Sequence, residues 1–433
     1  MFFLFVPIII ERAFRHSSLA SHWLILFAIY LFLRAKRNSH SRKDYIYILL
    51  IILCVGIHPY FLPMVFGLTA ADAMDMYFFD KNKKKAITLL IISCLAIGGS
   101  SVVLGIFKLD SSTVNLFQGY GYFSANLNCF FNPVSTNIMG TGVDSKVYHW
   151  SAILPALPQT LGNYDGFNYL GIGGIFLLIF DILWLVWSFL FNRKKLVNLG
   201  KKYIFLIIIM ILFATYAITN TITLNELQVQ IWIPDWVEKI CGIFAASGRF
   251  MYPVYYIILI FGFIQLGKMR LKDGIKNCIF ATILLLQIWD LHGMVALKHS
   301  YFDNFQYALH TNSPYETEYD TSFWSSVAQK YNSVWIIDSY RSIGYGLAEF
   351  CAKNNLKTNY MVSNRFSAEE LEQATHLESK LLEDLKAGNL ESDSVYIITD
   401  LTLADELKNN LEGIASFSYD NYYYGKFLII LPD

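Results

Sequence analysis

Charged residues are scarce in this chain of 433 residues, at 16% against 55% hydrophobic residues, and the mean hydropathy is +0.40. One soluble core cannot hide so much apolar surface, so a soluble enzyme is excluded. Cysteine is sparse too: the chain has six cysteines, which lie far apart and form no CxxC pair. This spacing predicts neither a zinc site nor a disulfide framework. A single bond between Cys129 and Cys241, which we place in one compartment, stays open as an alternative.

Long apolar runs are what the sequence has in abundance. A membrane-spanning helix needs about 17–25 mostly apolar residues. The candidate runs, of which the first two are short, are 21–34, 44–57, 60–79, 86–106, 167–191, 203–220, 250–267 and 277–292. The run 1–10 has neither the basic start nor the cleavage site of a signal peptide, and we interpret it as the back half of a further span. The sequence therefore predicts an all-α polytopic membrane domain of about nine spans over residues 1–293, the first of them partial.

Basic residues between these runs indicate the orientation. They gather in the connections 34–43, 81–85, 193–202 and 268–276. Lys and Arg near span ends are retained in the cytoplasm. With these four connections placed inside, every interval between them holds an even number of spans, so the topology is consistent. The segments 11–21, 107–166 and 221–249, and everything after 292, then face outward. Because the basic runs form no single patch, we expect the lipid bilayer as partner and no nucleic acid.

The region 298–433 is more polar and acidic. Short apolar runs at 333–338, 394–400 and 426–431 predict buried strands, and Ser367 with Glu370 predicts a helix start. We expect a small α/β domain on the extracytoplasmic side of the membrane. This region contains no glycine-rich phosphate loop, HExxH or GxSxG motif, so a lid or recognition role is favoured over a second catalytic domain.

The outer loop over 107–166 combines aromatic rings with side-chain amides. Its candidates for binding a sugar are Tyr120, Tyr122, Asn126, Asn128 and Asn132. The C–H faces of a sugar stack on rings, while its hydroxyls hydrogen-bond to amides. The alternative is an aromatic belt at the membrane interface, which explains the rings but has no need of the amides.

Arg249 follows Ala-Ala-Ser-Gly at the point where an outer loop enters a span. A guanidinium there can hold a lipid-linked phosphate bidentately, and the small residues before it let backbones come close. Snorkelling of the side chain to lipid headgroups is the alternative. Asp165 is the acid best placed to reach the sugar loop, and it is the candidate catalytic carboxylate.

Further polar residues lie near or inside the predicted spans. Arg12, Arg15 and His16 share one helical face that could meet an anionic group, although a helix lying on headgroups explains them equally well. His58 precedes a proline and is a proton acceptor or, with more weight, a hydrogen-bonded structural residue. Asp181 lies mid-span and Asp290 ends the last span, and the sequence assigns no purpose to either.

Several runs taken together resemble a known family: RHSSLASHW (15–23), HPY (58–60), GYGYFSANLN (119–128) with FNP (131–133), DGFNYLG (165–171) and ASGRF (246–250). The set is similar to an uncharacterised family of bacterial multi-spanning proteins, a domain of unknown function, that looks like the class C glycosyltransferases. The similarity covers most of 11–293, and the tail matches the carboxy-terminal domain of that family in pattern. The resemblance implies a class C-like helical bundle in the bacterial inner membrane.

The resemblance also implies a reaction. Class C enzymes take a sugar from a polyprenyl-phosphate carrier at the outer face and invert the anomeric centre, with an acidic residue of the first outer loop. That residue has no counterpart here, so we expect a fragment or mispredicted start, or a binding-only relative. Our first hypothesis is a glycosyltransferase with a lipid-linked sugar as donor, a cell-envelope acceptor and no assigned metal ligands. The rivals are a transporter or flippase for a lipid-linked saccharide and a noncatalytic envelope assembly protein.

Overall fold

The chain divides into two compact units. The computed structural model describes residues 1–38, 44–105, 113–115, 120–135, 149–303, 319–337, 345–360, 365–408, 415–421 and 425–432. Unit 1 comprises Met1–Lys108 and Gln118–Lys298, and unit 2 comprises Leu109–Phe117 and His299–Asp433. The segment 109–117, which the sequence placed in an outer loop of the membrane domain, thus groups with unit 2, where strand β1 (Thr113–Asn115) pairs with β6 (Arg365–Ser367).

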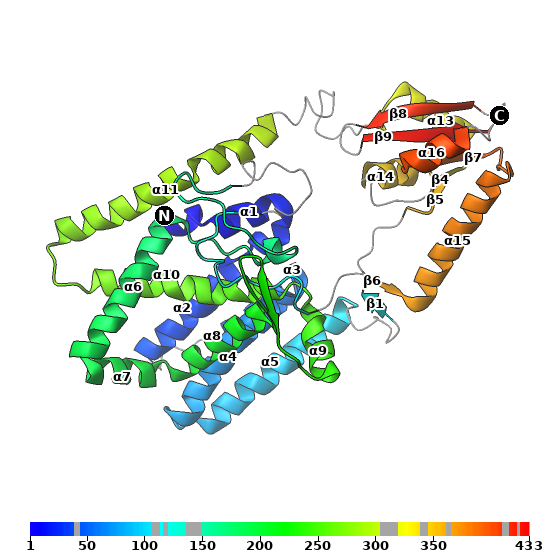
Figure 1. Ribbon diagram of the computed structural model, residues 1–433. Coiled ribbons are helices and arrows are strands. Elements are labelled where there is room, and N and C mark those ends of the chain that lie inside the picture. Colours follow the sequence, from blue (N-terminus) through cyan, green and yellow to red (C-terminus); the bar gives the residue numbers. More distant parts are fainter. Residues whose placement is uncertain are drawn as a thin grey trace. The chain divides into compact units, whose positions relative to one another are not determined.

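Each long apolar run of unit 1 forms a helix (Figure 1). The helices are α2 (Trp23–Arg37), α3 (Asp44–Ile57), α4 (Phe61–Phe78), α5 (Lys83–Val103), α6 (Gly171–Phe191), α8 (Ile204–Ile218), α10 (Tyr252–Gly267) and α11 (Asp273–Asp303). Within the described residues, 5 helical segments are long and apolar enough to cross a membrane, or 6 if α8 and the helix α7 (Arg193–Lys202), bent by 77°, count as one. A mostly helical membrane protein with a small α/β region is therefore confirmed.

The amino-terminal run differs from the half-span that we predicted. A 3₁₀ helix, η1 (Phe2–Phe5), ends at an extended Val6, and α1 (Pro7–Arg15) begins there. Proline has no backbone N–H to continue a preceding helix, but its fixed φ suits the first helical position. Helix α1 buries Glu11 and Arg12 and exposes Phe14, so it delivers charged side chains to the interior of unit 1.

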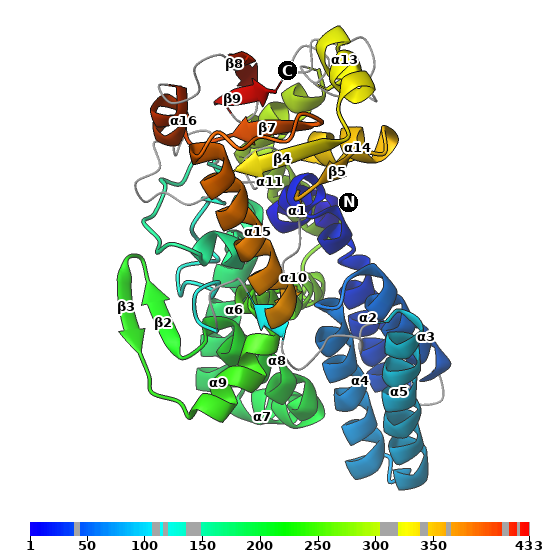
Figure 2. The ribbon, with the colours of Figure 1, turned by 90° about the vertical axis from the view of Figure 1, so that its right-hand side faces the viewer.

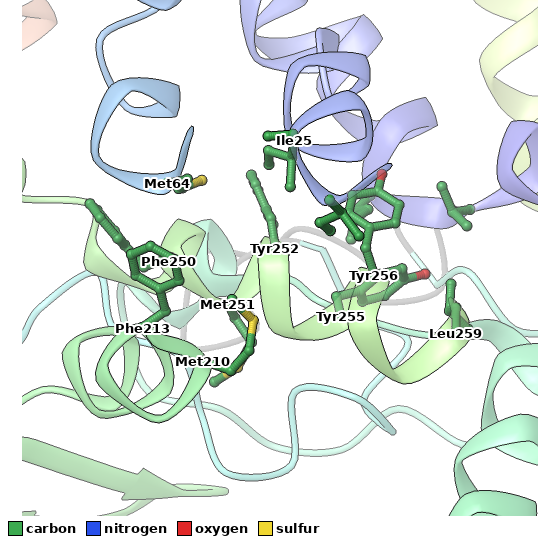
Figure 3. Packing of buried hydrophobic residues seen from close by; sticks show 14 of the residues in the cluster. Ile25, Met64, Met210, Phe213, Phe250, Met251, Tyr252, Tyr255, Tyr256 and Leu259 are labelled. Atoms are coloured by element: carbon green, nitrogen blue, oxygen red, sulfur yellow. The ribbon is translucent and has the colours of Figure 1, made fainter. Parts of the chain in front are cut away.

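The core of unit 1 is built around α10. Three tyrosines of this helix, Tyr252, Tyr255 and Tyr256, are fully buried, and Figure 3 shows them with Phe250 and Met251 in the hydrophobic packing. Helix α10 contacts α2, α6 and α8, and α4 contacts α2, α3, α5 and α8. The segment that leads into α10 is thereby fixed on several sides.

Unit 2 is a sheet with helices on both faces (Figure 2). The strand order is β5-β4-β7-β9-β8, parallel from β5 to β7 and antiparallel from β7 to β8. The strands are β4 (Ser333–Ile337), β5 (Lys357–Thr358), β7 (Ser394–Ile398), β8 (Ala415–Asn421) and β9 (Gly425–Leu431). The three runs predicted as strands are β4, β7 and β9, which lie next to each other in this sheet.

Alternation along each strand separates two cores in unit 2. Val395 and Ile397 face α13 (Ser322–Lys330) and α14 (Tyr345–Lys353), whereas Ile398 faces α15 (Ala368–Lys386) and α16 (Leu401–Lys408). Helix α15 begins directly after Ser367, as the sequence predicted. A sheet covered on both faces explains why its central strands are continuously apolar.

The six cysteines are all free, so the bond considered between Cys129 and Cys241 is not formed. Cys129 is buried in the unit 1 core, and burial raises the pKa of its thiol to about 12. A thiol with so high a pKa holds little thiolate at neutral pH, and thiolate is the form that forms disulfides.

Candidate functional site

A buried cluster of Asp165 and two arginines lies in unit 1. Arg12 Nη1 lies 2.7 Å from Asp165 Oδ1, and its Nη2 donates to the Asp165 backbone carbonyl at 2.6 Å. Arg249 grips the same carboxylate from another side, with Nη2 2.7 Å from Oδ2 and Nε 3.3 Å from Oδ1. Three segments far apart in the chain thus converge on one carboxylate.

Close backbone approach brings Asp165 and Arg249 together. Asp165 lies in the 3₁₀ helix η5 (Asn163–Gly166), and Arg249 lies in η7 (Ser247–Met251). A Cβ added at Gly248 would lie 2.5 Å from the Cα of Gly166, which leaves no room for a side chain. Gly248 N–H also donates to the Phe123 carbonyl at 2.9 Å. The glycine before Arg249 is therefore required by packing, as the small residues in the sequence suggested.

The cluster carries an excess of positive charge. Burial alone would raise the pKa of the Asp165 carboxyl, but the two guanidiniums outweigh it and lower the pKa to about 2. One carboxylate between two guanidiniums leaves one positive charge uncompensated within the group. A buried uncompensated charge is costly, which favours an anionic ligand as the missing counter-charge.

Arg249 and His58 retain hydrogen-bonding groups that no residue in the described part of the chain engages. Arg249 commits Nε and Nη2 to Asp165 and stacks over the Tyr60 ring at 4.6 Å, and its Nη1 has no hydrogen-bond partner among the described residues. His58 Nδ1 accepts the backbone N–H of Tyr60 at 3.3 Å, which leaves its Nε2 to carry the proton of the neutral ring. Burial, reinforced by Arg249, lowers the pKa of His58 to about 4. His58 is therefore a neutral N–H donor at pH 7.

The residues of the helical face that we predicted to meet an anionic group divide in the structure. Arg12 is buried, with Nε donating to the Tyr252 hydroxyl at 2.8 Å, whereas His16 is exposed just after α1. Arg15 ends α1, and its side chain lies outside the described part of the structure. His16 acts electrostatically on His58, so an exposed imidazole and the buried guanidiniums belong to one positive region.

The asparagines predicted to bind sugar are committed to the protein itself. Asn126 Nδ2 donates to Asn163 Oδ1 at 3.1 Å and to the Asn225 carbonyl at 2.8 Å, and Asn128 Nδ2 donates to Asn225 Oδ1 at 2.6 Å. Asn132 Nδ2 donates to the Leu157 carbonyl, and its Oδ1 accepts the backbone N–H groups of Val134 and Leu157. In this structure the amides hold the loops of residues 120–135, 149–166 and 221–230 together.

The two predicted aromatic residues remain half-buried. The Tyr120 ring packs against Tyr216 at 5.3 Å between centroids, and its hydroxyl donates to the Tyr216 carbonyl at 3.3 Å. Tyr122 packs edge-to-face on Phe123 at 4.7 Å. Within the described residues, neither ring makes a hydrogen bond or ring contact with Arg12, Asp165 or Arg249, so the motif that contains them contributes mainly through the backbone of Phe123.

Comparison with known families covers both units. Residues 1–292 match the model described as domain of unknown function DUF6311, and residues 323–426 match the DUF6311 C-terminal domain. The chain belongs to this family. Neither the curated proteins nor the solved structures contain a match. No function is attached to DUF6311, and the comparison establishes no link to class C glycosyltransferases, so the chemistry of this DUF6311 chain has to be argued from its own residues.

A second buried carboxylate, Asp290 of α11, has only neutral donors. Its Oδ2 accepts the Tyr169 hydroxyl at 2.7 Å and the Ile172 N–H at 3.1 Å, and its Oδ1 accepts the Ser151 hydroxyl. Its backbone carbonyl accepts Ala152 N–H at 2.8 Å. Asp290 therefore fastens the loop around Ser151 and the start of α6 to α11, and both of its carboxylate oxygens are engaged by described residues.

Sequence reasoning missed several partners of the cluster. Tyr60 entered only through an apolar run and the HPY motif, and Tyr252 only through an apolar run, yet Tyr60 supports Arg249 and Tyr252 accepts from Arg12. The sequence also indicated no partner for Glu11, which lies 3.2 Å from Lys298, and both residues are buried. The helical periodicity of the segment 7–15 was the signal that could have shown that Glu11 and Arg12 are buried. The described residues contain no group of three His, Cys, Asp or Glu that could hold a metal.

Proposed function

We propose that this chain is a membrane glycosyltransferase that takes a sugar from a polyprenyl-phosphate carrier and binds the carrier phosphate at the Arg12–Asp165–Arg249 cluster. The supporting observation is that two buried guanidiniums share one carboxylate. Arginine suits phosphate because its planar donors match the oxygen geometry. The transfer itself rests on the resemblance of the motifs around 58–60, 119–128 and 246–250 to class C enzymes.

In this proposal the free donors meet the ligand. Arg249 Nη1 and His58 Nε2–H hydrogen-bond the phosphate oxygens, while Tyr60 holds the guanidinium plane. During transfer the bond between the anomeric carbon and the phosphate oxygen breaks with its electron pair going to the phosphate, a bond to the acceptor oxygen forms, and the proton of the acceptor hydroxyl passes to solvent. Negative charge then grows on the leaving phosphate, and preorganised guanidiniums stabilise such charge.

Asp165 is assigned a positioning role. A carboxylate with a pKa of about 2 and both oxygens engaged is too weak a base to accept a proton at neutral pH. Its function in the proposal is to hold the two guanidiniums at a fixed separation. The sequence hypothesis that Asp165 activates the acceptor is therefore replaced by one in which it orients Arg249.

Transport of a lipid-linked saccharide is the rival function. Secondary transporters are typically built from repeats with broken helices in corresponding positions of both halves. The described residues contain one bent pair, α7 with α8, and α7 is a basic helix that contains no acidic residue. A single bend of this kind offers no support for a paired repeat.

The test is transfer of radiolabelled sugar from a polyprenyl-phosphate donor by the purified full-length protein. We expect Arg249→Lys to lose at least about a hundredfold in rate, because the single ammonium cannot hold Asp165 and a phosphate together. Lys84→Gln on the exposed start of α5 is the matched control and should retain full transfer. Absence of transfer combined with movement of the labelled lipid across a vesicle membrane would instead establish the transporter.

A further inference from the structure

Two hollows lie at the other end of the helices that carry the cluster. An apolar cavity of about 360 Å³ lies between α2, α6, α7, α8 and α10, and a groove of about 930 Å³ adjoins it between α6, α7 and the end of α10. Leu199, Gln265 and Lys268 line both, so the two spaces meet. Helix α6 runs 21 residues from the cluster end to the groove, a rise of about 30 Å.

The groove is apolar on one side and basic on the other. Its apolar wall includes Leu183, Trp184 and Trp187 of α6. Its basic side consists of Lys195, Lys202, Lys268 and Arg270. None of the residues that line either space is acidic. Because α7 bends by 77° from α8, this basic helix leaves the direction of the span, as helices lying in a membrane interface do.

Gln265 points to a polar ligand at the junction of the two spaces. This residue is 7% exposed, lines both hollows, and its side-chain amide has no hydrogen-bond partner among the described residues. The residue as a whole is buried, but its amide atoms stay accessible from the hollows, so a ligand there can reach them. Helix packing does not explain the amide, since an apolar side chain would suit the surrounding leucines and isoleucines better. A ligand that brings oxygen atoms to the mouth of an apolar cavity would satisfy it.

We propose that this pair of hollows binds one anionic phospholipid of the bilayer. An acyl chain fills the apolar cavity, the headgroup phosphate lies among Lys195, Lys202 and Lys268, and Gln265 donates to an ester or phosphate oxygen. Basic residues at an interface attract anionic lipid, and Trp side chains favour the same depth. The site is about one helix length from the Arg12–Asp165–Arg249 cluster, so it does not depend on the function proposed for that cluster.

Native mass spectrometry of the full chain tests the proposal. Dioleoylphosphatidylglycerol and dioleoylphosphatidylcholine are offered in equal amounts, and the wild type is expected to retain one phosphatidylglycerol preferentially. The variant Lys195→Gln/Lys202→Gln/Lys268→Gln should lose about a hundredfold in that preference. The control Lys81→Gln/Lys84→Gln/Lys194→Gln removes the same charge from exposed residues outside both hollows and should keep it.

Gln265→Leu provides a second variant that keeps every charge. It should reduce the preference about tenfold, since one hydrogen bond to a charged group is lost, and it should leave or raise thermal stability because the amide had no protein partner. If both triple lysine variants lost the phosphatidylglycerol preference equally, the proposal would be overturned, because general charge attraction would then explain the binding. Retention of added undecaprenyl phosphate over phosphatidylglycerol would also overturn it, because the occupant would then be a carrier lipid.

Discussion

Two of the buried carboxylates of unit 1, Asp165 and Asp290, have opposite surroundings. Asp165 is 5% exposed and Asp290 is fully buried, yet Asp165 is held by guanidiniums and Asp290 by hydroxyls and a backbone N–H. The Asp290 arrangement demonstrates that neutral donors suffice to fasten loops to helices in this molecule. The second guanidinium at Asp165 is therefore not needed to anchor the loops. This extra positive charge distinguishes a candidate binding site from a purely structural contact.

Removing the charge at Asp165 should have the largest effect. Asp165→Asn keeps the side-chain volume but leaves Arg12 and Arg249 buried without a counter-ion, so we expect a loss of about 3–5 kcal/mol in the free energy of unfolding. The measurement is thermal and denaturant unfolding of the purified protein. An anionic ligand of the cluster should partly restore the variant, since it would supply the missing charge.

Asp290→Asn is the matched comparison. It replaces a carboxylate held by neutral groups, so one donor among Ser151, Tyr169 and Ile172 loses its acceptor, and we expect about 1–3 kcal/mol. Inorganic phosphate should not rescue this variant. If the two substitutions cost the same and respond alike to phosphate, the distinction between the two sites is wrong.

Gly248→Ala tests how the cluster is assembled. The added methyl would lie 2.5 Å from the Gly166 Cα, so the segments of Asp165 and Arg249 must separate. We expect a loss of about 2–3 kcal/mol in stability, as for overpacking in a filled core. Gly200→Ala is the control, since a Cβ there meets no atom within 4 Å. Unfolding temperatures that match in the two variants would remove the close approach from the explanation.

The sequence predicted elements well and contacts poorly. The length of the apolar runs alone located the helices α2, α3, α4, α5, α6, α8, α10 and α11. The strands β4, β7 and β9 were predicted because buried strands are short and apolar. The meeting of Arg12 with Asp165 was not predictable, because it joins residues 153 apart and no local period encodes such a pair. Only Gly248 carried a local signal, through its small size beside Arg249.

The amides show a second limit of sequence reasoning, and their role in binding a sugar stays a prediction. Asn126, Asn128 and Asn132 beside tyrosines fit a sugar site in the sequence, yet side-chain amides bond equally well to backbone groups of loops without regular secondary structure. Composition cannot distinguish these uses, since both need the same donors and acceptors. The deciding quantity is whether partners are available within the fold, and here they are supplied by Asn163, Asn225 and neighbouring carbonyls.

Acid titration separates the cluster from the rest of the molecule. The folded pKa of Asp165 is lowered from 3.8 to about 2, so its stabilisation is complete above about pH 4 and is lost as the pH falls to about 2, by about 2 kcal/mol. His58, with its pKa lowered from 6.5 to about 4, loses stability in a higher window as the pH falls from about 6.5 to about 4.

Unfolding temperatures measured from pH 7 to pH 2 resolve these windows. Asp165→Asn should abolish the lower loss and His58→Gln should reduce the upper one, while Asp290→Asn should keep both. A lower loss that persists in Asp165→Asn would mean that another carboxylate is responsible for it, and the charge balance inferred for the cluster would then be incorrect.

Ser151→Ala should have the smallest effect on stability among the variants that compare the Asp165 and Asp290 sites. Asp290 would lose one neutral donor, and the backbone N–H groups of Ile153 and Leu154 would lose the Ser151 hydroxyl as acceptor. Because Asp290 keeps Tyr169 and the Ile172 N–H, the expected loss is about 1 kcal/mol, detectable as a small drop in unfolding temperature. Sugar transfer should be unchanged, whereas Arg249→Lys loses it. A transfer defect in Ser151→Ala larger than its stability defect would place Asp290 in the chemistry and end its role as the purely structural member of the pair.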